Sequence, residues 1–265
     1  MTRLQATLIH LGISAFVLAG FFALVFFIWY PAPYFSIEGT NTIISILIGV
    51  DLFLGPLLTF VVFKSGKPGL KFDLSLIALF QIVALFYGAQ TIYNERPYFI
   101  AFAYNQFNII SASELGSLNM AGLNTSEVDH SPLGPTYVYV DEPGNAILRL
   151  LIQLKPDSPG LERRPELYRH FKTNIARAYP DSLDLNTLAS QYPGNKAIVQ
   201  AFLDRHPDTR KLLFYPVAGK NRNGVLVLDR KASEVVDFID LDPRQKRHAP
   251  APPNPLESLK QDLNS

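Results

Sequence analysis

The sequence contains no cysteine, and charged residues are scarce over its first 95 positions. Without cysteine the chain forms no disulfide, holds no thiolate-bound metal and has no cysteine nucleophile. Up to Glu95 there are four basic and four acidic residues, whereas the remaining 170 residues hold 20 basic and 19 acidic ones. The first part therefore has the composition of a membrane domain. The second has that of a soluble domain long enough to bury its own core.

Sequence motifs of catalysis and of phosphate binding are also missing. The chain has no nucleophile elbow, no zinc-protease helix motif and no phosphate-binding loop. The five histidines are scattered without the spacing of metal ligands, which favours solvated surface positions. The second part has a net charge of +1, so charge gives no argument for binding nucleic acid. We therefore expect no catalytic residues, no cofactor and no metal site.

Three apolar segments are long enough to cross a lipid bilayer. They cover about residues 8–30, 42–63 and 73–93, and about 20 residues suffice to span the hydrocarbon core. A cleaved signal peptide is the alternative for the first segment. Its apolar run exceeds the usual length of about 7–15 residues, and no A-x-A site follows, so we favour a span. Trp29 and Tyr30 lie where an aromatic belt is expected.

Basic residues predict the orientation of these spans. The turn between the second and third spans carries Lys64, Lys67 and Lys71, and Arg3 precedes the first span. The loop at 31–41 has no lysine or arginine. Since basic loops stay in the cytoplasm, we expect the N-terminus and the basic turn inside and the chain after the third span outside.

We divide the chain into a membrane domain (1–95), an α+β domain (96–243) and a disordered tail (244–265), which is rich in proline and charge. Aromatic and β-branched runs predict strands at 136–140, 211–217 and 225–229. The runs at 98–104 and 107–111 fit two strands or one bent strand, and the run at 235–239 fits a last strand or a turn. Apolar periodicity predicts helices at 165–178, after Asp184 and at 195–206. The run at 145–154 fits either state.

For one helix and one turn of the α+β domain, the sequence also predicts individual residues. In the helix at 195–206, Ile198, Ala201 and Phe202 are expected to face inward. Asn223–Gly224 is a hairpin-turn signal between the strands at 211–217 and 225–229.

Small residues recur at helical spacing in all three spans. They are Ala15, Ala19 and Ala23 in the first span, Ser45 and Gly49 in the second, and Ala84 and Gly88 in the third. Small residues four positions apart let helices approach closely in lipid. Packing among the three helices and a groove for the transmembrane helix of a partner both explain the pattern.

Asp51 lies inside the second span, where a carboxylate is costly unless it faces the helix bundle or water. A hydrogen bond to Gln81 or Tyr87, a polar contact with a partner helix and a proton relay all fit it. Pro56, which follows Gly55, should kink the helix or free a nearby carbonyl.

A resemblance to a known family rests on the second and third spans. The segments GVDLFLGPLLTFVVFK (49–64) and LKFDLSLIALFQIVALFYG (70–88), with the ERP at the end of the third span, resemble type IV pilin accessory proteins of the TfpX/TfpZ type. The resemblance extends more loosely over YFIAFAYNQFNII, LERRPELY and FIDLDP. It departs at Tyr104–Asn105–Gln106, where an acid followed by an arginine is expected, and this argues against a charge-based role for that turn.

The resemblance implies a non-enzymatic accessory factor in the bacterial inner membrane, which supports assembly or stability of a cognate major pilin. A pilin subunit has an apolar helix in the bilayer and a head in the periplasm, so both parts of this chain could contact it. We expect the helix on the small-residue faces near Ser45–Gly49 and Ala84–Gly88, with Asp51 as a polar anchor. We expect the head on the strands at 98–111 and 211–229.

Folding of the pilin, its extraction from the membrane and control of pilus retraction are all compatible with this interpretation, as are a monomer and an oligomer. A different class of function remains open: a membrane-anchored sensor or regulatory subunit of an envelope system. A cytoplasmic output module would favour that class, and none is expected in the short segments predicted to lie inside.

Overall fold

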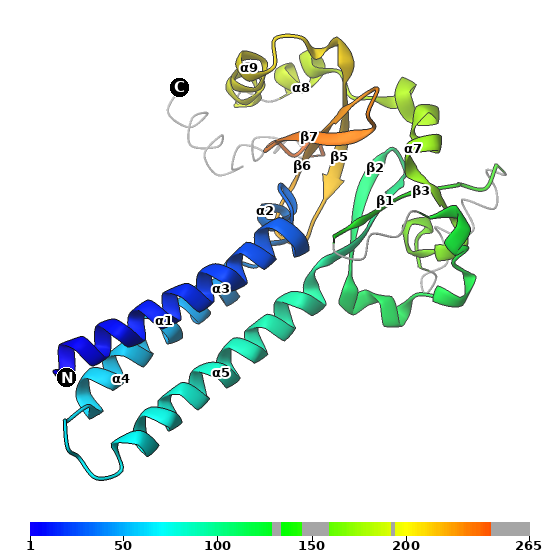
Figure 1. The fold of residues 1–265 in the computed structure, drawn as a ribbon. Helices are drawn as coiled ribbons and strands as arrows, with labels where there is room; N and C mark the ends of the chain where they lie inside the picture. Colours follow the sequence, from blue (N-terminus) through cyan, green and yellow to red (C-terminus); the bar gives the residue numbers. More distant parts are fainter. Residues whose placement is uncertain (129–133, 145–158, 192–193, 245–265) are drawn as a thin grey trace, which may run out of the picture.

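The computed structural model describes residues 1–128, 134–144, 159–191 and 194–244, and it shows a helical arm joined to a sheet domain (Figure 1). As predicted, three helices within the described residues are long and apolar enough to cross a membrane: Arg3–Trp29, Asn41–Val62 and Leu70–Glu95. A domain of helices and strands follows, which confirms the predicted fold class. The ambiguous run at 145–154 and nearly all of the predicted tail lie outside the described residues.

The first two spans change their helical winding along their length. α1 (Arg3–Leu24) continues into a π-helical turn at Val25–Trp29. The second span consists of α3 (Asn41–Ile48), a π-helical turn (Gly49–Leu54) and α4 (Gly55–Val62). The third span is one regular helix, α5 (Leu70–Glu95). Thr2 begins α1 with a capping box, because its hydroxyl accepts from Gln5 N and the Gln5 side chain accepts from Thr2 N.

The loop predicted between the first two spans contains a short helix, α2 (Tyr34–Glu38), that packs into the sheet domain. Tyr34 and Ile37 are buried in the same apolar cluster as the central strands. The hydroxyls of Tyr34 and Tyr137 lie 2.7 Å apart. The sheet domain is therefore completed by residues that precede the second and third spans in sequence.

Seven strands form one mixed sheet in the order β4-β3-β1-β2-β5-β6-β7. The strands are β1 (Pro97–Ala103), β2 (Gln106–Ser111), β3 (Thr136–Val140), β4 (Tyr168–His170), β5 (Leu212–Ala218), β6 (Asn223–Asp229) and β7 (Glu234–Ile239). β1–β3 and β2–β5 are parallel pairs, and the other neighbours are antiparallel. The turn between β1 and β2 holds Tyr104 and Asn105 at φ +54° and +57°, as a two-residue hairpin of this twist requires.

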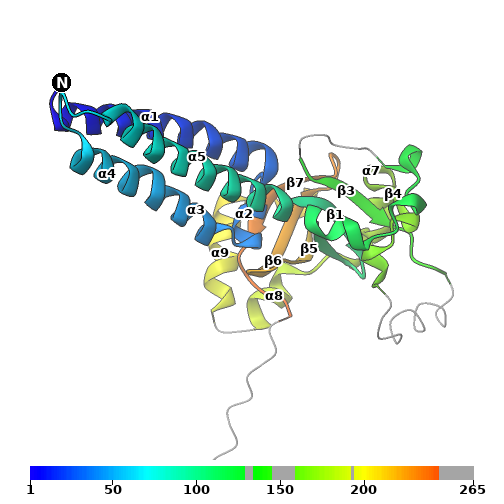
Figure 2. The same ribbon diagram turned by 90° about the horizontal axis from the view of Figure 1, so that it is seen from below.

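Both faces of the central strands are covered. One face, with Phe102, Tyr215 and Leu226, packs against α2 and α7 (Phe171–Asn174). The opposite face of β5 and β6 packs against α8 (Leu185–Gln191) and α9 (Asn195–Arg205), which lie at that end of the sheet in Figure 2. Alternate residues of a strand point to opposite faces, so nearly all of β1 and β6 is buried.

Two predicted features of the sheet domain are wrong. The predicted helix at 165–178 is broken up, because Tyr168–His170 form β4 and pair with β3 while Tyr168 is buried. Main-chain pairing and burial here outweigh local helix propensity. The predicted turn residues Asn223 and Gly224 are the first residues of β6 and pair with Ala218 and Val217, so the turn itself spans 219–222.

The inward face predicted for the helix at 195–206 is also partly wrong. Phe202 is buried as expected, but Ile198 and Ala201 are exposed and Val199 is buried in their place. The helix is turned by about one residue from the expected position, because its contact with β5 and β6 selects the side that holds both Val199 and Phe202.

A candidate functional site in the membrane arm

Four polar side chains from the three spans meet inside the arm. His10 lies on α1, Asp51 and Thr59 belong to the second span, and Gln81 lies on α5. His10 Nδ1 is 2.6 Å from Thr59 Oγ1, and His10 Nε2 is 2.7 Å from Gln81 Oε1. Gln81 Nε2 donates to the backbone carbonyl of Asp51 at 3.3 Å. We call these four residues the polar cluster.

The amide of Gln81 determines which atoms donate in its own contacts within the polar cluster. Its amide oxygen only accepts, so His10 Nε2 carries the hydrogen in this contact. The other ring nitrogen of His10, Nδ1, forms a hydrogen bond with the Thr59 hydroxyl. The Gln81 amide nitrogen donates to the second span. The cluster thus joins all three spans through a chain of hydrogen bonds.

Asp51 is the member of the cluster with an unmet hydrogen-bond acceptor. Only 5% of its surface is exposed, and its buried Oδ1 has no donor within hydrogen-bond distance among the residues that the structure describes. Such an oxygen in a membrane arm is costly, because neither lipid nor the surrounding side chains supply a hydrogen.

The second span has a wider helical turn at the position of Asp51. Asp51 lies in the π-helical turn, where Gly55 N donates to the carbonyl of Val50, five residues earlier. Pro56 follows directly and has no N–H to donate. The predicted disturbance near Pro56 is thus a turn of wider winding, a feature found often at functional sites.

Gly55 allows the close approach of the second and third spans. A Cβ atom at this position would lie 2.2 Å from Gln81 Nε2. Only glycine leaves room for the Gln81 amide, which must reach both His10 and Asp51.

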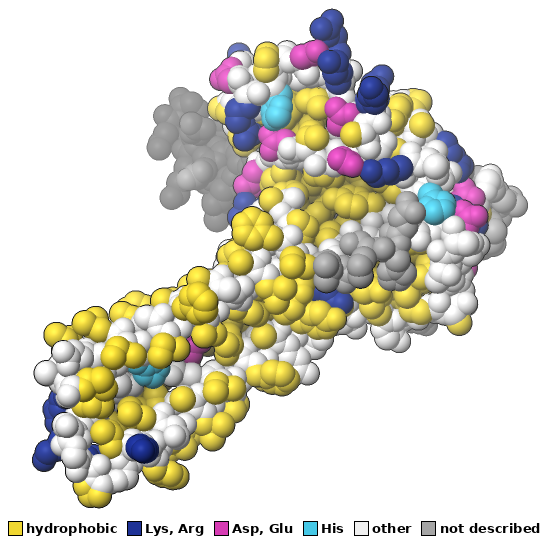
Figure 3. Space-filling view, viewed as in Figure 1, with side chains coloured by type: hydrophobic (Ala, Val, Ile, Leu, Met, Phe, Trp, Pro, Cys, Tyr) yellow, Lys and Arg dark blue, Asp and Glu magenta, His cyan; other side chains and the backbone are white. Residues whose placement is uncertain are grey.

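A groove opens between α1 and α5 beside the polar cluster. It encloses about 240 Å³, and its lining is almost entirely apolar apart from the polar cluster and Ser14. The apolar lining residues are Ile13, Val17, Ala78, Ile82 and Leu85, and His10, Asp51 and Gln81 line the same groove. Figure 3 shows a histidine and an acidic side chain on this side of the arm, in an otherwise apolar surface.

A second set of polar contacts joins the arm to the sheet domain. Lys220, in the turn between β5 and β6, pairs with Glu95 at the end of α5. Its backbone N–H donates to the buried carboxylate of Glu38 on α2 (3.4 Å). The next two backbone N–H groups both donate to the carbonyl of Ile37, at 3.0 and 3.2 Å. One turn of the sheet therefore holds both α2 and the end of the third span.

Comparison with known proteins identifies the family. The family model of the fimbrial assembly protein FimB matches residues 1–39, which hold α1 and α2. The chain is 37% identical over 110 residues to the fimbrial assembly protein of serogroups C1 and C2 from Dichelobacter nodosus. These residues are 40% of this chain and 83% of that relative. The chain belongs to the family of fimbrial assembly proteins.

Two further relatives differ in length. The fimbrial assembly proteins of serogroups I and E1 from the same organism are each 36% identical to this chain over 110 residues. The matched part is 42% of each of these relatives, so the chain matches less than half of their length. No solved structure matches the chain. The family assignment agrees with the predicted resemblance to pilin accessory proteins.

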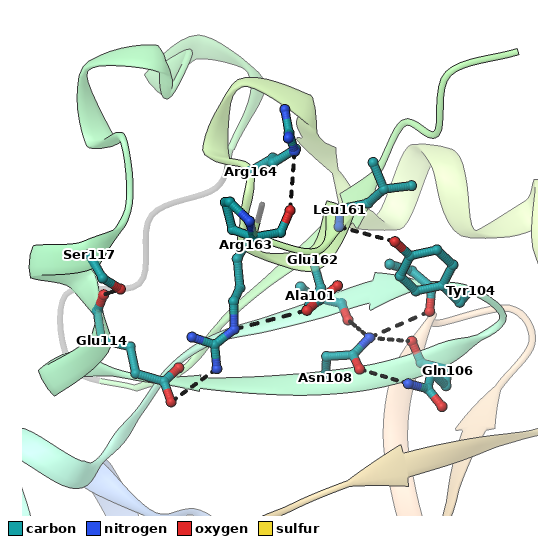
Figure 4. Close-up of polar contacts among 12 residues, drawn as sticks. Ala101, Tyr104, Gln106, Asn108, Glu114, Ser117, Leu161, Glu162, Arg163 and Arg164 are labelled. Atoms are coloured by element: carbon teal, nitrogen blue, oxygen red, sulfur yellow. Dashed lines mark hydrogen bonds and ion pairs between the residues drawn. The ribbon is translucent and has the colours of Figure 1, made fainter. Parts of the chain in front are cut away.

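Two of the looser parts of that resemblance, the β1–β2 hairpin and the segment at 161–168, meet in the sheet domain of this fimbrial assembly protein (Figure 4). Leu161 N donates to the Tyr104 hydroxyl at 3.1 Å, which joins the segment at 161–168 to the tip of the β1–β2 hairpin. Gln106 accepts from Arg244, directly after the segment at 238–243. At the turn that departs from the family pattern, a phenol and an amide make these contacts in place of a charged pair.

The small residues predicted as contacts of the fimbrial assembly protein have different surroundings. Gly88 is buried, and a Cβ atom there would lie 2.7 Å from Leu47 of α3, so this glycine packs helices within the arm. Ser45 is exposed and its hydroxyl donates to the carbonyl of Asn41. Gly49 has no neighbour within 4 Å of a Cβ position, and Ala84 is half-buried. A contact of Ser45, Gly49 and Ala84 with a partner stays a prediction.

Two other expected contacts stay predictions. In the strands at 98–111 and 211–229, which we expect to meet a partner, about half of the residues are buried. Tyr30, which we expect in an aromatic belt, is buried in the arm, and its hydroxyl donates to the carbonyl of Ile92. Trp29 packs its ring edge-on against Tyr93, with centroids 5.1 Å apart.

Histidine 10 is the main functional candidate that sequence reasoning missed. It was grouped with the other histidines as solvated, but it is half-buried and bonded to two spans. His206 is also not simply solvated, since it lies 2.9 Å from Asp237 and stacks on Phe202. His130 and His248 lie outside the described residues.

A signal for the polar cluster was present in the sequence. Asp51 lies eleven residues before the end of α4 and Gln81 eleven residues after the start of α5. Two antiparallel helices joined by a short turn place such residues at the same depth, because the rise per residue is constant. These residue counts alone therefore pair Asp51 with Gln81, one of the two hydrogen-bond partners predicted for it.

Proposed function

We propose that this protein is a non-enzymatic accessory factor of the bacterial inner membrane that supports assembly or stability of a cognate type IV pilin. The observation that carries the proposal is the match to 83% of a fimbrial assembly protein at 37% identity. Pilin is the partner because it is the subunit from which such fimbriae are built. The action is chaperone-like: the protein binds a pilin subunit before it enters the fimbria.

The joined arm and sheet domain support this role. α2 and the turn at 219–222 tie the sheet domain to the end of the arm. A protein built in this way can contact a membrane helix and a head domain of the same subunit together. Simultaneous contact raises affinity, because the second contact forms within one complex.

The positions of the basic residues support the proposed orientation. The N-terminus and the turn between α4 and α5 lie at the same end of the arm, away from the sheet domain (Figure 1). This end carries Arg3, Lys64, Lys67 and Lys71. By the positive-inside rule, it lies in the cytoplasm and the sheet domain lies in the periplasm.

The test is deletion of the gene, with surface pilin and total cellular pilin measured in parallel. We expect a loss of surface pilin that a plasmid copy of the gene restores. Normal total pilin would place the action at assembly, whereas reduced total pilin would place it at protection of the subunit. Unchanged amounts of both would contradict the proposal.

The same deletion in a strain with disabled pilus retraction separates two forms of the proposal. Recovery of surface pilin there assigns the protein to extension or to opposing retraction. Continued loss assigns it to an earlier step, before the subunit joins the fimbria. If the deletion changes neither surface pilin nor total pilin in the parent strain, the proposal is wrong whatever the result in this second strain.

A further inference from the structure

The groove between α1 and α5 has a polar end and apolar walls. At the polar end His10 bonds to Gln81. Beyond this contact the walls are apolar, with Ile13 on α1 and Ala78 on α5 among the lining residues. From His10 to Val17 the wall is about 10 Å long, or two helical turns.

An acceptor without a donor lies in this groove. Asp51 lines it, is 95% buried, and has an Oδ1 atom that no donor of the described residues reaches. The Gln81 amide nitrogen bonds to the backbone carbonyl of Asp51, and His10 bonds to Gln81 and Thr59. The Oδ1 atom of Asp51 is therefore open to a donor from another molecule.

We propose that this groove is the seat of a transmembrane helix of the pilin partner, and that the helix presents a hydrogen-bond donor to Asp51. This inference rests on the proposed function. A cavity of about 240 Å³ is too small for a whole helix but holds side chains from one helix face. The partner helix therefore lies across the mouth, buries apolar side chains between α1 and α5, and places one hydroxyl, amide or ammonium group at Asp51.

Complementarity favours this face of the arm over the small-residue face at Gly88 and the one on α1. The face at Gly88 is filled by Leu47 of α3. The small residues Ala15, Ala19 and Ala23 are exposed on α1, but no polar group of the cluster lies beside them. In lipid, apolar contact alone distinguishes helices weakly, whereas a buried acceptor selects a partner that carries a donor.

The absence of cysteine makes a direct test possible, because a single introduced cysteine is the only thiol in the full-length chain. Ala78→Cys places a thiol in the groove, and Ala15→Cys places one on an exposed part of α1 outside it. Each variant is expressed in the native host together with its major pilin carrying single cysteines along the apolar helix. Disulfide formation is then induced in the membranes.

We expect Ala78→Cys to form a disulfide with a subset of pilin positions spaced three or four residues apart, at least five times more than Ala15→Cys. A disulfide between two copies of Ala78→Cys, or equal yields at both positions, overturns the inference. So does the absence of any pilin adduct at Ala78→Cys, as expected if lipid occupies the groove. The proposed function survives these failures if gene deletion still removes surface pilin.

The donor is tested by changing Asp51 in the Ala78→Cys background. We expect Asp51→Leu to lower the disulfide yield at least five-fold, because no acceptor is left. Asp51→Asn keeps an acceptor oxygen, so a yield within two-fold identifies a neutral donor and a five-fold loss identifies a cationic one. An unchanged yield in Asp51→Leu overturns the role of Asp51. Ala78→Phe, which fills the groove and leaves Asp51 in place, should lower surface pilin, and Ala15→Phe is its matched control.

Discussion

Glu38 is a carboxylate buried between the membrane arm and the sheet domain, with 8% of its surface exposed. Burial raises the pKa of Glu38 from 4.5 to about 7, and the backbone N–H and the charge of Lys220 oppose this shift. Between these two pKa values the folded protein keeps a proton that the unfolded chain has released. The free energy of unfolding therefore decreases as the pH rises from about 4.5 to about 7.

The substitution Glu38→Gln should remove this pH dependence. Gln is never charged, and its amide oxygen still accepts from Lys220 N. We expect the variant to be more stable than the wild type at pH 8 by about 3 kcal/mol, and nearly equal to it at pH 4.5. Thermal unfolding of the full chain in detergent at the two pH values measures the difference. An equal difference at both values would show that the charge of Glu38 is not the cause.

At the scale of single elements, the second membrane helix builds the candidate site. Its π-helical turn holds Asp51, Gly55 admits Gln81, and Thr59 reaches His10. The sequence predicted this helix and its acid, since apolar length and one charge are local properties. It did not predict the contact with His10, because the sides on which α1 and α4 meet depend on the packing of both surfaces.

Gly55→Ala should destabilise this element although alanine is the better helix former. The new methyl group would lie 2.2 Å from Gln81 Nε2, so the Gln81 amide has to shift, which weakens its hydrogen bonds with His10 and with the Asp51 carbonyl. We expect a loss of about 1–3 kcal/mol in the free energy of unfolding, measured by thermal unfolding in detergent.

Gly20→Ala is the matched control, because nothing lies within 4 Å of a Cβ atom at that position of α1. Its stability should equal or slightly exceed that of the wild type. Equal losses in both variants would mean that the close approach at Gly55 has no special role.

Other elements show where local patterns succeed and fail. The β1–β2 and β5–β6 hairpins pair largely as predicted, since alternating and aromatic runs are local signals. The local pattern of the segment at 165–178 predicts a helix, but part of the segment pairs with the main chain of β3, and Tyr168 is buried in the core. A contact between residues about 30 positions apart thus overrides the local pattern.

At the scale of the whole molecule, α2 joins the two parts. Ile37 lies between two membrane spans in sequence, yet it has no exposed surface and packs in the core of the sheet domain. The core of the sheet domain is therefore complete only when the loop between the first two spans has docked.

Ile37→Ala should destabilise the sheet domain by about 2–5 kcal/mol, as expected for truncation of a fully buried aliphatic side chain. Hydrogen exchange in β5 and β6, measured on the full chain, should become faster. Ile46→Ala is the control, because Ile46 is 59% exposed on α3. Unchanged exchange in Ile37→Ala would show that the sheet domain is stable without α2.

Apolar length, charge and alternation are properties of contiguous residues, so the three spans, the position of the basic residues and most strands are predictable from the sequence alone. The contact of His10 with Gln81, the docking of α2 in the sheet domain and the groove between α1 and α5 arise only when the chain folds. These features depend on the side that each element turns to its neighbours. That choice follows from the fit of surfaces distant in sequence, which no local pattern contains.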